Sequence, residues 1–264
     1  MSGLPVIGSQ DPWSGGMHSS RLRCVLAPNP SPMTLDGTNT WLVGANDDRI
    51  VIDPGPDSEA HLRRIAEGGR VRQILLTHGH PDHAEGARRL NEITGAPVRA
   101  LDPAHRLGQE GLEAGDVVVV DDVEIHVVAT PGHTSDCLSF FVPSDSALLT
   151  GDTVLGRGTT VVAYPDGDLG AYLRSLMSLR ELAVAQEATH LLPGHGPVLD
   201  DPVGVLDAYL KHRQARLEQV RAVWAGGRRS ADEIVDVVYA DVPAQVRFAA
   251  LASTLAQVAY LEGH

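Results

Sequence analysis

The chain has 264 residues, of which 43% are hydrophobic and 21% are charged, and its formal net charge at pH 7 is -13. These proportions are typical of a globular protein of one or two domains, and they exclude a disordered chain. No apolar run approaches the roughly 18 residues that cross a bilayer, which excludes a membrane span, and the negative charge excludes a general attraction to phosphate backbones.

Short runs rich in β-branched or apolar residues, bounded by Gly, Pro, Asp and Asn, predict the strands. Between some of them, leucine and isoleucine spacing predicts helices over 58–67, 84–92 and 169–188, the first of them capped by Ser58. Several strands between 117 and 150 follow one another directly, which favours an α+β layered sandwich over an alternating parallel sheet. The predicted strands are 22–27, 40–44, 49–53, 73–77, 117–120, 123–129, 137–142 and 146–150.

The composition changes after Pro202. An amphipathic pattern over 205–226, a capping box from Ser230 to Glu233 and a further pattern over 244–261 predict three helices. We therefore expect a domain over 1–203 and a helical appendage over 204–264. Basic and acidic side chains balance in the appendage, so the net negative charge lies in the first domain.

The beginning of the chain and its cysteines bear on the cellular compartment. Residues 1–6 lack the basic start and the apolar stretch of a secretory signal, so we expect the protein in the cytoplasm. Cys24 and Cys137 both lie in predicted strands, and two cysteines provide neither a disulfide framework nor a thiolate metal site. We expect both to fill the core.

The strongest chemical signal follows the predicted strand that ends at Thr77. Residues 78–83 read His-Gly-His-Pro-Asp-His, between that strand and the start of a helix. So many polar side chains cannot enter an apolar core without a large desolvation cost, which a divalent cation offsets. The segment therefore predicts a metal site with the ligands His78, His80, Asp82 and His83.

Three further polar groups each follow an apolar strand. His133 stands in Thr-Pro-Gly-His-Thr, Asp152 in Thr-Gly-Asp-Thr and His195 in Pro-Gly-His-Gly-Pro. Each motif alone is common in turns and is weak evidence. Ligands carried on strand ends along one edge of a sandwich can converge, so together they predict one shared site.

Five imidazoles and two carboxylates are too many for one four-coordinate ion, so two divalent ions fit. Nitrogen and oxygen donors without a thiolate suit zinc first, with iron or manganese as alternatives. Asp53 ends the strand predicted over 49–53 and precedes Pro-Gly, and it is either a partner of a ligand histidine or a turn cap.

With these ligands in this order, the chain resembles the metallo-β-lactamase superfamily of binuclear hydrolases over nearly its whole length. Residues 34–44 (Thr-Leu-Asp-Gly-Thr-Asn-Thr-Trp-Leu-Val-Gly), residues 52–55 (Ile-Asp-Pro-Gly) and the three-helix tail are similar to the β-lactamase-like protein 2 group. The mitochondrial animal member of that group is a single-strand endoribonuclease, and the fungal polyketide thioesterases are similar too.

The resemblance implies a four-layer αβ/βα sandwich with a winged-helix-like tail. The tail of this group usually continues into a small β wing, which we expect to be missing here because the chain ends first. The implied ligands are His78, His80 and His133 for metal 1, Asp82, His83 and His195 for metal 2, and Asp152 as the bridge between them.

The resemblance also implies hydrolysis by a hydroxide that bridges the two ions, because metal binding lowers the pKa of water from 15.7 to about 7. Asp82 is the expected catalytic residue, since it can bind metal 2, orient the attacking water and pass a proton to the leaving group. No side-chain nucleophile is required.

Substrate selection is expected from the loops over 28–38 and 156–164. There, Arg157 is either a surface charge or an anion clamp, and Tyr164 is expected to pack rather than bind. Basic residues of the first tail helix are read as a solvated face in preference to a phosphate-binding face; they are Lys211, Arg213, Arg216 and Arg221.

Three functions fit this reading. Cleavage of single-stranded RNA is the leading specific prediction, from the resemblance. A small ester or thioester substrate, as for an acyl-CoA or acyl-carrier thioesterase or a glyoxalase II-like enzyme, is the alternative that the acidic composition favours. A non-catalytic metal-binding module is the third and least favoured function. A site that had lost its activity would be expected to have lost ligands, and all seven ligand positions are filled. No membrane partner is expected, and the tail helices leave room for a homodimer.

Overall fold

The computed structural model describes residues 9, 11–44, 46–108, 110–227 and 230–263. Residues 1–6, on which the predicted cytoplasmic location rests, lie outside this part of the chain. Among the described residues, no helix has both the length and the apolar character that a membrane crossing requires.

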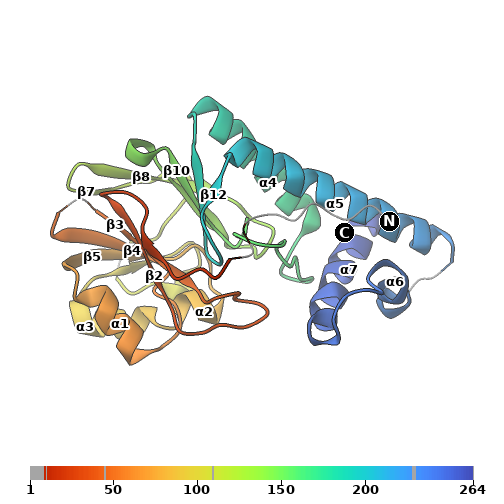
Figure 1. Cartoon of the computed structure of the whole chain (residues 1–264), viewed down its shortest axis with the longest axis horizontal. Coiled ribbons are helices and arrows are strands. Elements are labelled where there is room, and N and C mark those ends of the chain that lie inside the picture. Colours follow the sequence, from red (N-terminus) through yellow and green to blue (C-terminus); the bar gives the residue numbers. More distant parts are fainter. Residues whose placement is uncertain (1–8, 10, 45, 109, 228–229, 264) are drawn as a thin grey trace.

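In the described chain, two mixed six-stranded sheets pack face to face (Figure 1). The first sheet runs, in spatial order, β1 (Gly16–Met17), β2 (Leu22–Leu26), β3 (Asn39–Val43), β4 (Asp48–Ile52), β5 (Arg70–Leu75) and β6 (Val98–Arg99). The second runs β12 (Leu199–Asp200), β11 (His190–Pro193), β10 (Ala147–Gly151), β9 (Leu138–Val142), β8 (Val123–Ala129) and β7 (Val117–Val120). Each sheet has a parallel pair beside antiparallel neighbours, β4 with β5 and β10 with β11.

Helices cover the outer face of each sheet (Figure 1). Leu62 of α1 (Glu59–Ala66) and Leu90 of α3 (Ala87–Thr94) pack on the first sheet, and Leu176 of α4 (Leu169–Ala185) packs on the second. The predicted four-layer α+β sandwich is therefore confirmed. The remaining helices are α2 (Pro81–Ala84), α5 (Pro202–Ala225), α6 (Ala231–Val238) and α7 (Arg247–Glu262), with short 3-10 turns at Pro103–His105, Pro143–Asp145 and Ala244–Val246.

Alternation along the strands builds the core between the sheets. Ile50 and Ile52 of β4 enter the same cluster as Val123, Ile125 and Val127 of β8, because side chains two apart lie on one face of a strand. The intervening Val51 points the other way and packs with the helices on the outer face.

The main predicted strands and helices are present, and the differences are local. The pairs that form β1, β6 and β12 are too short for a periodicity signal. The helix expected over 84–92 is divided into α2 and α3 near Gly86, where a Cβ would lie 2.9 Å from the Pro56 carbonyl oxygen. Ser58 occupies the N-cap position of α1 without a capping hydrogen bond from its side chain, whereas the capping box at Ser230 is formed.

Both cysteines are free and buried, as expected of core residues. Burial raises the pKa of the Cys24 thiol and of the Cys137 thiol to about 12, so neither is a reactive thiolate near neutral pH. The Cys24 Sγ donates to Oδ1 of Asn39.

The three tail helices are joined to the sandwich through α5, which runs along α4 (Figure 1). Leu206 and Tyr209 of α5 and Ala256 of α7 belong to the same buried cluster as Leu176 of α4. The division predicted between residues 203 and 204 falls within the first turn of α5 and stays a prediction.

Candidate metal centre

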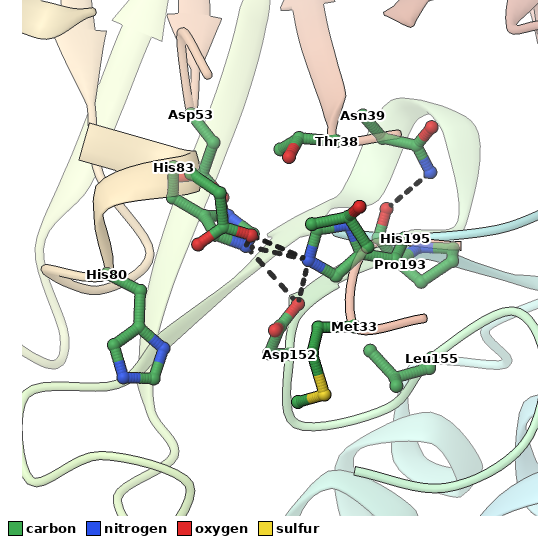
Figure 2. A network of polar contacts seen from close by, with 12 residues as sticks. Met33, Thr38, Asn39, Asp53, His80, His83, Asp152, Leu155, Pro193 and His195 are labelled. Carbon is green, nitrogen blue, oxygen red and sulfur yellow. Dashed lines mark hydrogen bonds and ion pairs between the residues drawn. The ribbon is translucent and has the colours of Figure 1, made fainter. Parts of the chain in front are cut away.

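All seven predicted ligands meet at one edge of the sandwich, each in a segment that follows a strand, with Asp82 and His83 in the short helix α2. The segment with His78, His80, Asp82 and His83 follows β5 and enters α2. The other three follow β8, β10 and β11 of the second sheet, and they are His133, Asp152 and His195. Figure 2 shows His83, His195 and Asp152 pointing toward one another, with His80 on the neighbouring loop.

The first ligand group, called group 1, consists of His78, His80 and His133. Nδ1 of His80 lies 3.1 Å from Nε2 of His78 and 3.1 Å from Nε2 of His133. Tetrahedral zinc with zinc–nitrogen bonds of 2.0–2.1 Å places its nitrogen ligands about 3.3 Å apart. Group 1 therefore has the spacing that one ion requires.

The second group, called group 2, consists of Asp82, His83 and His195. Nε2 of His195 lies 3.1 Å from Oδ2 of Asp82 and 3.2 Å from Nε2 of His83. The third edge, from Asp82 Oδ2 to His83 Nε2, is 3.6 Å. These distances also fit one ion.

Asp152 lies between the two groups. Its Oδ1 is 3.4 Å from Nε2 of His83 and 3.4 Å from Nε2 of His195, while its Oδ2 is 3.7 Å from Nε2 of His133. Oδ1 is buried and has no hydrogen-bond partner among the described residues. A buried carboxylate oxygen left in this way is unfavourable unless a cation compensates it, so Asp152 has the position of a bridging ligand.

The outer nitrogens of the group 2 histidines are occupied by acceptors. Nδ1 of His83 donates to Oδ2 of Asp53 at 2.8 Å, and Nδ1 of His195 donates to the carbonyl oxygen of Gly37 at 3.2 Å. With the protons on Nδ1, both Nε2 atoms present lone pairs to the centre. Asp53, for which sequence left two roles open, is therefore a partner of a ligand histidine.

Group 1 is held in the same way by different atoms. Nδ1 of His133 donates to the carbonyl oxygen of Val161 at 2.6 Å. The hydroxyl of Thr77 lies 2.9 Å from Nδ1 of His78 and donates its own proton to Asp53, so it accepts from the imidazole. Lone pairs from both groups thus converge on two points, an arrangement that needs positive charge there.

The electrostatics agree with this reading. Burial lowers the pKa of His78 and of His133. Burial has the same effect on His83 and His195, but Asp152 and its neighbours reverse it, raising the pKa of His83 well above its usual range and that of His195 to about 9. Burial would raise the pKa of Asp152, yet His195 and His83 hold it well below its ordinary value. The site favours positive charge, which divalent ions supply.

The metallo-beta-lactamase superfamily model matches residues 33–195, a stretch that contains every one of these ligands. The chain belongs to this superfamily. Its members are generally hydrolases. It is 34% identical to the Beta-lactamase-like protein 2 homolog of Caenorhabditis elegans over 86% of this chain and 79% of the relative. It is also 34% identical to the Lactamase-like protein aptB of Emericella nidulans, over 91% and 80%.

A solved structure supports the fold. The beta-lactamase domain protein from Burkholderia ambifaria superposes with a TM-score of 0.80 at 24% identity, covering 98% of this chain and 92% of that one. At this identity the likeness is evidence of the metallo-β-lactamase fold alone, and it extends over the tail helices. The superfamily and fold that the sequence predicts are therefore confirmed.

One glycine of this metallo-β-lactamase domain makes the convergence of the ligands possible. A Cβ at Gly194 would lie 2.7 Å from Oδ1 of Asp152 and 2.7 Å from Cε1 of His83. Any side chain there would push the carboxylate of Asp152 away from group 2. In the Gly-His pair that follows β11, His195 is a predicted ligand, and Gly194 leaves the space in which the ligands meet.

A cavity of about 280 Å³ lies beside the candidate metal centre, since His133 and Asp152 are among its lining residues, and it extends to the tail helices. Figure 2 shows Met33 and Leu155 beside Asp152. Its walls are mostly apolar; the apolar members include Met33, Leu35, Leu155, Val161, Val246, Ala249 and Ala250.

The loop residues singled out from the sequence behave differently from one another. Arg157 lines the cavity and forms an ion pair with Asp36, which joins the 28–38 loop to the 156–164 loop. Tyr164 is 50% exposed, so it packs only in part, and it is not among the residues that line this cavity; its peptide bond to Pro165 is cis.

The prediction that the basic residues of α5 form a solvated face holds for Lys211 and Arg221 but is wrong for Arg213. Arg213 is 7% exposed and stacks on the ring of Tyr172, and Arg216 stacks on Tyr239. The spacing carried the missing signal, since Arg213 falls on the helix face with the buried residues Leu206, Tyr209, Leu217 and Val220.

Proposed function

We propose that this protein is a hydrolase that works with two divalent metal ions, zinc in the first place and iron or manganese as alternatives. The observation that carries the proposal is the arrangement of donor atoms: two groups with the spacing of single-ion sites, joined by Asp152. Bound there, two divalent cations supply a nucleophile near neutral pH and stabilise the negative charge that develops on the substrate.

The proposed roles follow from position. His78, His80 and His133 would hold one ion, Asp82, His83 and His195 the other, and Asp152 both. Asp53, Gly37 and Val161 keep the imidazoles in the tautomer that presents Nε2 to the centre.

Asp82 is proposed as the catalytic residue. Its Oδ2 faces His195 and His83, and its side chain is 30% exposed, more than Asp152 or the group 2 histidines. Within the described residues, Oδ1 of Asp82 makes no hydrogen bond or ion pair. That oxygen is therefore available to orient a water molecule and to carry a proton to the leaving group.

For the substrate, we propose an acyl thioester or ester whose acyl portion occupies the cavity. The apolar lining suits an acyl chain. The two arginines in the wall are already engaged, Arg157 by Asp36 and Arg213 by Thr160 and the Tyr172 ring, so little charge is free to bind phosphates.

Single-stranded RNA, the leading prediction from sequence, is the second candidate. It is supported by the 34% identity with the Beta-lactamase-like protein 2 homolog, which extends over 86% of this chain. The charge of the chain does not support RNA as the substrate, because a net charge of -13 repels the phosphate backbone.

The test combines metal analysis with a substrate panel. Protein purified without chelator is expected to hold two ions per chain and to hydrolyse acyl-CoA faster than single-stranded RNA or a chromogenic cephalosporin. A chelator should abolish turnover and added zinc should restore it. Turnover that a chelator leaves unchanged would contradict the metal mechanism, and faster cleavage of RNA would reverse the order of the two substrates.

A further inference from the structure

The chain between β10 and α4, residues 152–168, contains neither helix nor strand, although it begins with Asp152 and contains the Val161 carbonyl that fixes His133. A segment of this kind keeps its shape only if other parts of the molecule hold it. We call it the bridging loop.

Side chains from α4 and α5 hold the bridging loop. The hydroxyl of Tyr172 donates to the carbonyl oxygen of Thr153 at 2.7 Å, and the hydroxyl of Tyr209 accepts from the amide of Leu155 at 2.9 Å. Arg213 donates to the carbonyl oxygen of Thr160. Tyr209 and Arg213 both belong to the helix that begins the tail.

Thr160, whose carbonyl oxygen accepts from Arg213, and the next residue, Val161, both contact predicted metal ligands. Oγ1 of Thr160 donates to the carbonyl oxygen of Asp152 at 2.6 Å. The next residue, Val161, accepts from Nδ1 of His133 at 2.6 Å. The Thr160–Val161 backbone thus touches the bridging ligand and one ligand of group 1, while the partners of the group 2 histidines, Asp53 and Gly37, lie elsewhere.

The environment of Arg213 indicates that its position is not explained by stability alone. The guanidinium is buried, its carbon atom lies 4.8 Å from the centre of the Tyr172 ring, and its Nε has no partner. No carboxylate of the described chain pairs with it. Burying a cation without an anion is costly, and the neutral Thr160 carbonyl compensates only part of that cost.

We propose that Arg213 is a positioning residue for group 1. By holding the Thr160–Val161 backbone from α5, it sets the ring of His133 at the distance and tautomer that one metal ion needs. The helical tail would then be a structural part of the metal centre rather than an appendage. This inference rests on the proposed two-metal function.

The same helix offers a matched control. Arg216 also stacks on a tyrosine, with its guanidinium carbon 4.4 Å from the Tyr239 ring centre, and it also donates to a backbone carbonyl, that of Val238 at 2.8 Å. Val238 ends α6, far from the bridging loop in sequence. Arg216→Met therefore removes the same kind of contacts from the tail without releasing Thr160.

The experiment is a titration of metal-free protein with Co²⁺, followed by the visible absorption spectrum and the unfolding temperature. Arg216→Met is expected to bind each of the two ions as tightly as the wild type does. Arg213→Met should keep the ion of group 2 but bind the ion of group 1 about 10- to 100-fold more weakly, the usual cost of losing a partner of a ligand histidine. Its spectrum should move toward that of His133→Ala and away from that of Asp82→Ala.

A second pair of variants keeps the test valid if Arg213→Met does not fold. Thr160→Val removes the hydroxyl that reaches the Asp152 carbonyl and keeps the side-chain volume, whereas Thr160→Ser retains the hydroxyl. The first should weaken the binding of cobalt, because the backbone of Asp152 loses a partner, and the second should not.

Three results would overturn the inference. Arg213→Met and Thr160→Val binding both ions as wild type does would exclude a positioning role. Equal weakening of both groups in Arg213→Met and Arg216→Met would show general destabilisation of the tail. Failure of the wild type to bind cobalt would remove the metal centre itself, and with it the proposed function, which distinguishes that outcome from the other two.

Discussion

The two ligand groups have the same spacing but different supports. In group 2, His83 donates to the buried carboxylate of Asp53, at the end of β4 in the first sheet. In group 1, His133 donates to a neutral carbonyl on the bridging loop, which α4 and the tail helix α5 hold, and His78 reaches Asp53 only through the hydroxyl of Thr77. One histidine of group 2 thus donates directly to a carboxylate, whereas His195 of group 2 and both supported histidines of group 1 donate to neutral oxygens.

This difference has an energetic consequence. A carboxylate acceptor makes the imidazole that donates to it a stronger base, and hence a stronger ligand, than a carbonyl acceptor does. Group 2 is therefore expected to bind its ion more tightly, while group 1 should respond more to changes in the tail. Four predictions test this contrast, beginning with the change that removes it altogether.

Asp152→Ala should prevent the centre from holding two ions together. The carboxylate of Asp152 faces both groups, one oxygen toward each, so its loss should leave each ion one ligand short and remove the bridge. We expect metal content to fall below two ions per chain and kcat/KM to fall by about 1,000-fold or more. Asp200→Ala, at an exposed carboxylate at the edge of the second sheet, is the control. Unchanged metal content in Asp152→Ala would contradict the bridging role.

Asp53→Asn should affect group 2 before group 1. Asp53 has a φ of 53°, in the left-handed region that asparagine tolerates well, so the substitution changes hydrogen bonding without straining the backbone. Affinity for the group 2 ion should fall about 10- to 100-fold, and that of group 1 by less. Stepwise cobalt titration measures both. Equal losses would show that Asp53 supports His78 through the Thr77 hydroxyl as strongly as it supports His83 through a direct hydrogen bond.

The contrast also shows how far sequence reasoning reaches. The convergence of the seven predicted ligands could be anticipated because four of them stand within six residues and the other three each follow a strand, so that together they form a recognisable set. Their supports were not, because two of them are main-chain carbonyls, those of Gly37 and Val161, and every residue has one. Only the fold determines which carbonyl faces which imidazole.

The fold was predictable for a similar reason, since alternation and apolar runs located the longer strands in both sheets. Arg213 shows the opposite case. Its charge suggests a solvent-exposed side chain, whereas its spacing of four residues from Tyr209 places both residues on the buried face of α5. For a charged residue, helical position is the better guide to burial when the neighbours three and four residues away are apolar.

A chelator should resolve the two groups in the wild type. Because the support of group 1 is neutral, its ion should leave first as the chelator concentration rises, at about one tenth of the concentration that empties group 2. Cobalt spectra recorded during the titration, compared with those of His133→Ala and Asp82→Ala, identify the remaining ion. Loss of the two ions in a single step, or departure of the group 2 ion first, would refute the proposed order.

The smallest effect concerns the metal-free protein. There, group 2 should cause the unfolding temperature to fall at alkaline pH (the alkaline limb), and group 1 should contribute to its fall at acid pH (the acid limb). In group 2 the folded-state pKa of His195 is raised to about 9, so the stability it contributes is fully present below the unfolded value near 6.5 and is lost as pH rises toward 9. In group 1, burial lowers the pKa of His133, so its contribution is present above pH 6.5 and is lost as pH falls.

The unfolding temperature of the metal-free protein should therefore be highest near pH 6.5 and fall by a few degrees on either side. His195→Gln should flatten the alkaline limb. His133→Gln should reduce the acid limb only in part, because burial lowers the pKa of His61 and of His212 to about 4, and both add to that limb in every variant. Zinc should remove the alkaline limb, since the ion replaces the protons. An alkaline limb that survives His195→Gln would assign it to His83, whose pKa is also raised and which is the other histidine of group 2.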